Sequence, residues 1–393
     1  MIENIKRSLV IIFLLTVISR LFAIYFFGDT VLTNEWRIII FNLENEGVFG
    51  SRSVDGKVVP NIFMPPLYAF FLAFVNYFVN DMENLIKSIL FIQLIFSTFS
   101  VFIIYKILES FFSKKTCIIS SFIFSLFPLN VYSVGQISSI TLQVFLLSIF
   151  FYFFVKVNFS KKIIYFIGFS IVSSGLILLR AEFVLFFIFS LIFIYFAQKN
   201  LKSILISIIL TLIIISPYII RNYVIFDKIV ITQSFGYNLW KGNNENLKVD
   251  GYYLQPNPRL AQKINNIGFD AKYDLLIDKI YQDEAVKFII NNPAEVIKLY
   301  FKKIYSFMFI DLNSSYPGYY NYAHIIPKII ISITTLLGIY FGLRNRIFNY
   351  FSSYFLLNIL AVSVFFILPR YSLALLPCQI IISSIYFEKI LKK

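Results

Sequence analysis

Charged residues are scarce in this chain of 393 residues, where they make up 14% of the sequence against 59% for hydrophobic residues. A typical soluble domain carries about 25% charged residues, so the composition excludes an ordinary soluble protein. The stretch from Thr116 to Val155 contains no Asp, Glu, Lys or Arg. Water solvates such a surface poorly, and we therefore expect it to be embedded in a membrane.

Cysteine and histidine are nearly absent as well, with two cysteines and one histidine. Cys117 and Cys378 both fall inside apolar segments, which predicts buried packing residues of low reactivity. Neither a disulfide framework nor a metal motif follows from so few residues. We therefore expect no metal centre, and the sequence implies no resident cofactor.

The apolar segments predict an all-α polytopic membrane protein with about 10–11 transmembrane segments. The segment at 64–80 is short and could be a re-entrant or interfacial piece, or half of a broken helix. No internal repeat is visible, which argues against an inverted-repeat transporter. The longer segments are 8–27, 88–105, 116–133, 138–155, 163–179, 183–198, 203–220, 329–343, 347–368 and 371–387.

The net charge of +14 would suit a nucleic-acid-binding protein, but much of the basic charge lies in short connections between apolar segments. There it orients membrane helices, so we expect no nucleic acid partner. The segment 8–27 is too long for a signal-peptide core and lacks a small-residue cleavage site, which predicts an uncleaved first span. The basic clusters are Lys6/Arg7, Lys106/Lys114/Lys115, Lys156/Lys161/Lys162, Lys199/Lys202, Arg344/Arg346 and Lys389/Lys392/Lys393.

All of these clusters can be cytoplasmic at once if the 64–80 segment is not a separate full crossing. This predicts a multi-pass protein of the cytoplasmic (inner) membrane with both termini in the cytoplasm. Two long segments then lie outside, at 28–63 and 221–325. The first should hold a helix at Arg37–Asn45, and the second a turn-rich loop at 236–244 suited to binding. Helices are expected near 270–291 and 294–309, and the latter could lie on the membrane surface.

Three arginines stand at the ends of apolar segments on this outer side, where basic residues should be rare. Arg180, Arg221 and Arg370 are therefore candidates for binding an anion. Glu35, in the first outer loop, supplies a carboxylate. Arg20 lies inside the first span, and we expect it to extend outward to the headgroups.

Several short stretches, in order along almost the whole chain, resemble bacterial GT-C glycosyltransferases of family 39, which are related to protein O-mannosyltransferases and aminoarabinose transferases. The sequence departs from that family by a glutamate, Glu35, where an aspartate is common. It also has Ser138, Ser139, Thr141 and Gln143 where a second acid is often seen. The stretches are Glu35-Trp36 with Asn42-Leu43 and Gly47, Pro65–Tyr68, Leu179-Arg180, Arg221–Tyr223, Gly236–Trp240, Gly242–Asn244, Asn292-Pro293, Arg370-Tyr371 and Leu376-Pro377.

The resemblance implies a single GT-C-like membrane domain over 1–393 that moves a sugar from a polyprenyl-phosphate carrier to a glycan, lipid or protein acceptor at the outer face. It implies inversion, with Glu35 as the general base and arginines on the carrier phosphate. The guanidinium fork suits phosphate oxygens. The substrate-binding residues expected on this basis are Arg370, Arg221, Arg180, Tyr68, Tyr371, His324, Trp240 and Asn243.

Each role has a simpler alternative. Glu35 could cap a helix or pair with Arg37, and Asp29, Glu44 and Glu46 are the other candidate acids. Arg370 could anchor a helix end at the headgroups, Arg180 could be neutralised by Glu182, and Arg221 could order its loop.

Other residues and the function itself also leave alternatives open. His324 could be an interfacial residue, and Tyr68 and Trp240 could be interfacial anchors. The competing functions are a flippase or transporter for lipid-linked sugars, and a glycan ligase or polymerase of envelope assembly.

Overall fold

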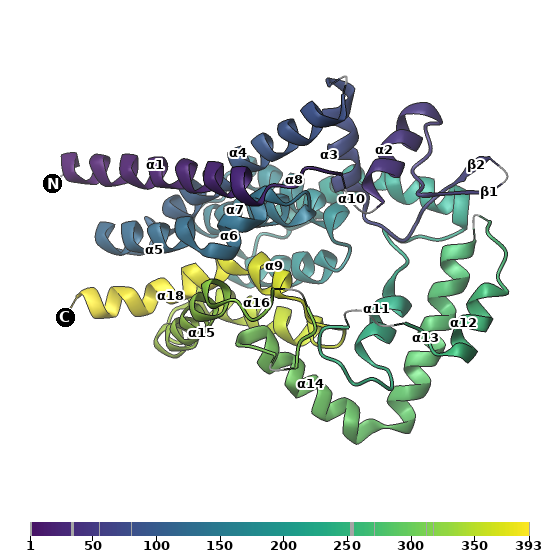
Figure 1. Cartoon of the computed structure of the whole chain (residues 1–393). Coiled ribbons are helices and arrows are strands. Elements are labelled where there is room, and N and C mark those ends of the chain that lie inside the picture. The colour runs from purple at the N-terminus through teal and green to yellow at the C-terminus, as the bar shows by residue number, and fades with distance from the viewer. Residues whose placement is uncertain are drawn as a thin grey trace.

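The computed structural model describes residues 2–32, 35–54, 56–79, 81–251, 255–270, 272–311, 313–316 and 318–392. It is a helical bundle with one small hairpin of strands (Figure 1). Five described helices are long and apolar enough to cross a membrane, which confirms an all-α polytopic membrane protein. These helices are α1 (Ile2–Phe27), α4 (Met82–Leu108), α7 (Ser139–Phe159), α10 (Leu201–Phe226) and α15 (Tyr322–Gly342).

The other predicted spans correspond to shorter or broken helices, and several of their boundaries differ from those expected. The segment expected at 116–133 bends by 54° between α5 and α6, where Pro128 cannot continue the helix. The segment expected at 347–368 already ends at Val362, and that expected at 371–387 is split before Leu376-Pro377. These helices are α5 (Lys114–Leu126), α6 (Pro128–Tyr132), α8 (Ile163–Leu179), α9 (Phe183–Gln198), α16 (Arg346–Val362), α17 (Pro369–Ala374) and α18 (Leu376–Leu391).

The 64–80 segment forms α3 (Pro66–Tyr77), a helix of 12 residues. At 1.5 Å per residue such a helix is about 18 Å long, less than the hydrocarbon thickness of a bilayer. A helix of this length is too short to cross the bilayer by itself. This agrees with the topology in which all basic clusters lie on one side of the membrane.

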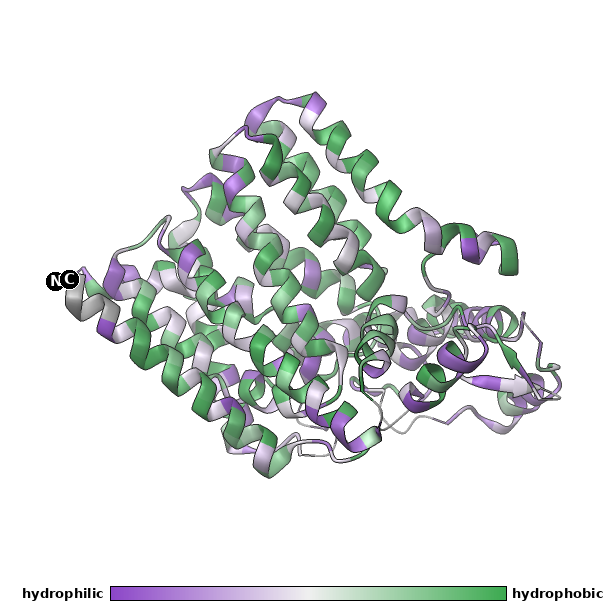
Figure 2. Cartoon of the chain, turned by 90° about the horizontal axis from the view of Figure 1, so that it is seen from above, coloured by the Kyte–Doolittle hydropathy of each residue, from purple (hydrophilic) through white to green (hydrophobic). Residues whose placement is uncertain are grey.

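The two chain termini lie at one end of the bundle, which we call the terminal end, and the polar segments gather at the opposite, loop end (Figure 1). Figure 2 shows hydrophobic residues along the bundle helices and hydrophilic residues concentrated at the loop end. This arrangement agrees with the prediction that both termini lie opposite the long loops. The loop-end elements are α2 (Trp36–Asn45), β1 (Arg52–Val54), β2 (Lys57–Val59), α11 (Phe235–Gly242), α12 (Pro258–Asn265), α13 (Tyr273–Asn291) and α14 (Pro293–Met308).

The sequence predicted α2, α13 and α14 to within a few residues, but the interpretation of 236–244 as a turn-rich loop was wrong. That stretch forms α11, because an acid from α13 caps its first turn, as shown below. The antiparallel β1–β2 hairpin and α12 were also not foreseen. Cys117 and Cys378 are buried and free, as expected.

Arg20 corrects another expectation, because it is buried with 0% exposure instead of extending outward. Its Nε donates to Ser97 Oγ at 3.2 Å, and its Nη1 donates to Ser19 Oγ and to the Ser125 carbonyl. Since α5 ends at Leu126, that carbonyl has no partner further along the helix. Arg20 therefore satisfies a backbone group that the break before Pro128 leaves open.

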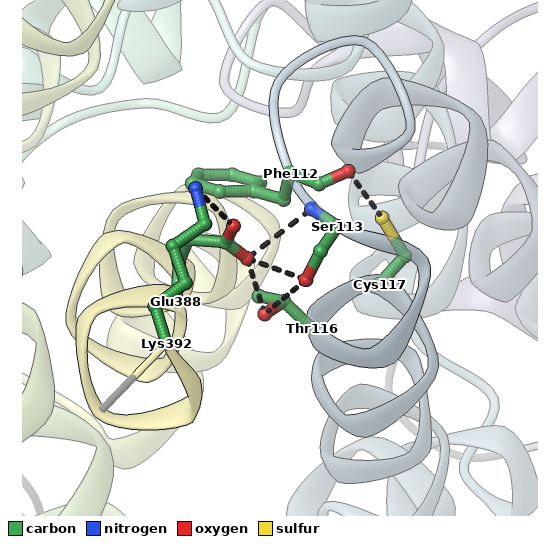
Figure 3. Close-up of polar contacts among 6 residues, drawn as sticks. All are labelled: Phe112, Ser113, Thr116, Cys117, Glu388 and Lys392. Carbon is green, nitrogen blue, oxygen red and sulfur yellow. Dashed lines mark hydrogen bonds and ion pairs between the residues drawn. The ribbon is translucent and has the colours of Figure 1, made fainter.

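At the terminal end, Glu388 of α18 caps the start of α5 (Figure 3). One carboxylate oxygen accepts from the backbone N–H of Ser113 at 3.1 Å, its hydroxyl at 2.8 Å and the Thr116 hydroxyl at 2.5 Å. The other oxygen pairs with Lys392 at 2.8 Å, one helical turn away. A carboxylate at a helix N-terminus is favoured by the unpaired N–H groups there.

We predict that Glu388→Gln lowers the thermal midpoint of the protein in detergent by a few degrees, because charge-assisted hydrogen bonds contribute about 1.5–3 kcal/mol. The matched control is Lys392→Gln, whose side chain is 70% exposed and whose loss should cost well under about 1 kcal/mol. Equal shifts for the two variants would show that the contacts to Ser113 and Thr116 do not matter.

Candidate active site at the loop end

Helix α11 is held at its N-terminal end by α13. Asp278, 1% exposed, accepts from the Tyr237 backbone N–H at 2.9 Å and from the Gln233 side chain at 2.7 Å. Gly236 lies directly against the Asp278 carbonyl, so a side chain at this position would collide with α13. The carboxylate thus satisfies a donor of the first helical turn and fixes where α11 begins.

The C-terminal end of α11 is held by the segment 363–368, which connects α16 to α17. Asn243 donates to the Leu239 carbonyl at 2.9 Å and to the Val364 carbonyl at 2.8 Å. Gly242 packs on the backbone of Phe365. The Ile367 N–H donates to the Val249 carbonyl at 2.9 Å. Helix α11 and the start of α17 are therefore joined by backbone contacts.

This joint brings Lys241 close to Arg370, and Arg370 and Arg180 both lie beside Tyr371. We call Lys241, Arg370 and Arg180 the cation group. The guanidinium carbons of Arg180 and Arg370 lie 5.9 and 5.8 Å from the centre of the Tyr371 ring. Burial, then the charge of Arg370, lowers the pKa of Lys241, while Asp250 opposes this shift. Like charges held together in this way favour an anionic ligand.

The two arginines retain their binding capacity. Among the described residues, neither Arg180 nor Arg370 lies within ion-pair distance of a carboxylate, Glu182 included. The charge of Glu182 does act on Tyr371, as do those of the two arginines. Arg370 is exposed in the first turn of α17, and Arg180 is half-buried at the end of α8. Their guanidinium groups are thus placed to contact an anion.

Glu35 lies close enough to α11 for its charge to act on Tyr237. It is exposed at the start of α2, and it neither caps that helix with its side chain nor pairs with Arg37 among the described residues. Burial, then the charge of Glu35, raises the pKa of Tyr237. The Lys241 ammonium in turn lies 5.5 Å from the Tyr237 ring centre. Tyr237 therefore lies near both Glu35 and Lys241, which is a member of the cation group.

The other acids of the first loop are engaged by the protein. Asp29 accepts from the Ile137 N–H at 2.6 Å, Glu46 accepts from the Val58 N–H at 3.4 Å, and Glu44 accepts from the Asn76 amide. Asp29 reaches the start of the 137–143 stretch, where the resembled family often has a second acid. Glu35 differs from all three because its carboxylate has no hydrogen-bond partner among the described residues.

Arg221 and Asn243, expected to bind substrate, are instead bound to the protein. Arg221 donates to the Asn61 carbonyl at 2.8 Å and to the Phe49 carbonyl at 3.3 Å, which ties α10 to the first loop. The Asn243 amide is used in the joint described above. These hydrogen bonds do not support substrate binding by Arg221 or Asn243, which stays a prediction.

Three further expected residues are buried in the core. Tyr68 is 1% exposed and packs edge-on to Trp36, and Trp240 is 5% exposed against Tyr281. His324 is 7% exposed near Tyr319, with ring centres 5.6 Å apart. Tyr68 and His324 have no described contact with the cation group. Trp240 directly precedes Lys241 in α11, and its ring centre lies 6.4 Å from that of Tyr237.

Sequence reasoning missed Lys241, Tyr237 and Asp278. Lys241 and Tyr237 stand in the Gly236–Asn244 stretch, four residues apart, so a helical interpretation would have placed them on one face. No local signal marks Asp278, because its role depends on a contact between α11 and α13. Among the described residues, no three His, Cys, Asp or Glu side chains come together as metal ligands do.

Comparison with known proteins bears on the fold. Residues 64–220 match the family described as dolichyl-phosphate-mannose-protein mannosyltransferase. The apo oligosaccharyltransferase of Archaeoglobus fulgidus superposes with a TM-score of 0.55 at 13% identity, over 99% of this chain and 50% of that chain. The chain has the fold of the GT-C glycosyltransferases.

A second structure with this GT-C fold is AglB from A. fulgidus in complex with an inhibitory peptide and a dolichol-phosphate. It matches with a TM-score of 0.54 at 12% identity, over 99% of this chain and 50% of that chain. The chain thus spans about half the length of the structures it matches. No curated protein sequence matches it. The family match covers Arg180 but not Glu35, Lys241 or Arg370, so the GT-C fold alone does not assign their roles.

We predict that Asp278→Ala loosens α11, because it leaves two buried donors without an acceptor at a cost of about 1–3 kcal/mol. Limited proteolysis should then cut between residues 230 and 250 about fivefold faster or more. Asp283→Ala is the control, since that side chain is 62% exposed on the same helix. Unchanged cleavage in Asp278→Ala would mean that packing alone holds α11.

Proposed function

We propose that the chain is a membrane glycosyltransferase that moves a sugar from a polyprenyl-phosphate carrier to an acceptor at the loop end. The observation that carries the proposal is that the unengaged carboxylate of Glu35 and the cation group both lie near α11, with Glu35 close to Tyr237 and Arg370 close to Lys241. A base and a set of cations in one place suit a reaction that removes a proton from one partner and releases an anion from the other.

The proposed reaction is a single displacement at the anomeric carbon. Glu35 accepts the proton of an acceptor hydroxyl or amine as that atom forms a bond to the anomeric carbon. The bond from this carbon to the phosphate oxygen breaks at the same time, and the electron pair leaves with the polyprenyl phosphate. Lys241, Arg370 and Arg180 stabilise the developing negative charge, and the anomeric configuration inverts.

The comparisons support the donor class without testing it in this chain. The matching family is described by a dolichyl-phosphate-mannose donor and a protein acceptor, and one similar structure holds a dolichol-phosphate. We infer that the donor here is also a polyprenyl-phosphate sugar and that the acceptor is a glycan, a lipid or a protein. The positive-inside pattern supports placing the loop end at the outer face of the cytoplasmic membrane.

The charge distribution favours a transferase over a flippase for lipid-linked sugars. A flippase would need polar groups along its path through the bundle. Arg20 is the fully buried arginine of the first span, and neighbouring polar groups of α1, α4 and α5 engage it. The cation group instead lies at the loop end, where a transferase needs it.

We predict that Glu35→Gln lowers sugar transfer by about 10²–10⁴-fold, because the acceptor loses its base. The assay is release of polyprenyl phosphate from a panel of polyprenyl-phosphate sugars by membranes that carry the protein. Binding of farnesyl phosphate, a short polyprenyl phosphate, should be unchanged. Glu44→Gln is the matched control because its carboxylate contacts Asn76. Full activity of Glu35→Gln would remove Glu35 from the mechanism, and no release by the wild type from any donor would overturn the proposed function.

We predict that Lys241→Met and Arg370→Met each weaken farnesyl phosphate binding by about tenfold to a hundredfold, the value of one charge-assisted hydrogen bond. Arg221→Met is the comparison variant. It should reduce thermal stability and leave binding within about twofold, because its guanidinium bonds to backbone carbonyls. A binding loss in Arg221→Met with none in Lys241→Met would place the phosphate elsewhere.

A further inference from the structure

Lys303 of α14 is a buried ammonium with one hydrogen-bond partner among the described residues. It is 1% exposed, and its Nζ donates to Asn243 Oδ1 at 3.3 Å. None of the described carboxylates lies within ion-pair distance of it. Lysines are almost never fully buried without an opposite charge, because desolvating the ammonium is costly. A methionine would fill the same space at a lower cost, so the choice of lysine calls for a reason.

The partner of Lys303 is the residue that closes the joint of α11. The Asn243 Nδ2 donates to one carbonyl of α11 and to the Val364 carbonyl, and its Oδ1 accepts from Lys303. With its Oδ1 bound to an obligate donor, the amide cannot flip, because a flipped amide would turn its own donors toward the ammonium. Lys303 thus fixes the direction in which Asn243 points.

Asn243 lies between two members of the cation group. Lys241 is two residues before it in α11, and Val364 begins the stretch that leads to Arg370. The Lys241 ammonium also lies 4.8 Å from the Phe366 ring centre, within the same stretch. A change at Asn243 would therefore alter how Lys241 sits relative to Arg370.

We propose that Lys303 is a positioning residue: through Asn243 it holds α11 against the segment 363–368 and so sets the arrangement of Lys241 and Arg370. The consequence for phosphate binding rests on the proposed function, whereas the mechanical role does not.

The protonation state of Lys303 links this joint to pH. Burial lowers the pKa of Lys303 to about 7. Among the described residues, no charged group adds to this effect of burial. The charged residues and the histidine on the helices packed against α14 are Asp274, Asp278, Lys279, Asp283, Glu284 and Lys287 on α13, His324 and Lys328 on α15, Arg346 on α16 and Arg370 on α17. The charged form is the strong donor to Asn243. Activity that depends on it should thus decline as the pH rises through about 7.

The test uses the full chain in nanodiscs with Lys303→Met, which keeps the buried volume and removes the donor. Hydrogen exchange should become faster in residues 235–249 and 363–368, while α7 and α15 stay as in the wild type. The thermal midpoint should stay the same or rise, because removing an unpaired buried charge is often neutral or stabilising. Sugar transfer should fall by about tenfold or more, since small displacements at a site are costly.

A second variant, Asn243→Asp, places a carboxylate against Lys303. The ammonium is then favoured, so the decline of activity at alkaline pH should move upward. In Lys303→Met that decline should disappear, with low activity at every pH. A purely structural lysine would shift the thermal midpoint without moving the pH profile.

The outcomes separate this inference from the proposed function. Unchanged hydrogen exchange in Lys303→Met would overturn the positioning role, whatever the activity. Faster hydrogen exchange at the joint would support the positioning role even if the wild-type protein had no transferase activity. A wild type without transferase activity would overturn only the proposed function. Wild-type activity and pH dependence in Lys303→Met would exclude any effect on the cation group.

Discussion

The loop end depends on one constraint, which is that both ends of α11 are fixed by hydrogen bonds to other segments of the chain. Asp278 holds its first turn, and Asn243 holds its last turn against the segment before α17. Tyr237 and Lys241 lie between these two points and owe their positions to them. Without these contacts, nothing would bring Glu35 and Arg370 to the same end of the protein, since most of the chain lies between them in the sequence.

The bundle provides the rigid base for that joint. Pro128 and Pro377 interrupt helices that composition alone would make continuous, and the open backbone groups are met locally, as Arg20 does for Ser125. At the terminal end, Glu388 ties α18 to α5. Helices α16, α17 and α18 are separated by breaks, and the break before α17 places Arg370 at the loop end near α11. The breaks between these helices thus help to position the cation group.

The sequence alone was sufficient for the class of protein and for the choice of some residues of the candidate site. Long apolar segments and the distribution of lysines and arginines predicted the helices and the common side of the termini, because both follow from local composition. Arg180 and Arg370 could be chosen because they break the charge pattern. Trp240 and Tyr68 could not be recognised as core residues, since aromatic side chains suit a core and an interface equally. Arg20, Lys241 and Asp278 depend on contacts between distant segments, which carry no local signal.

The most direct test of the central claim is a structure of the full chain determined with farnesyl phosphate bound. We expect the phosphate within hydrogen-bond distance of Lys241 and Arg370, with Arg180 near and Glu35 facing the space where a sugar would attach. A phosphate bound instead at Arg221 or near His324, with Lys241 and Arg370 free, would contradict the proposed site.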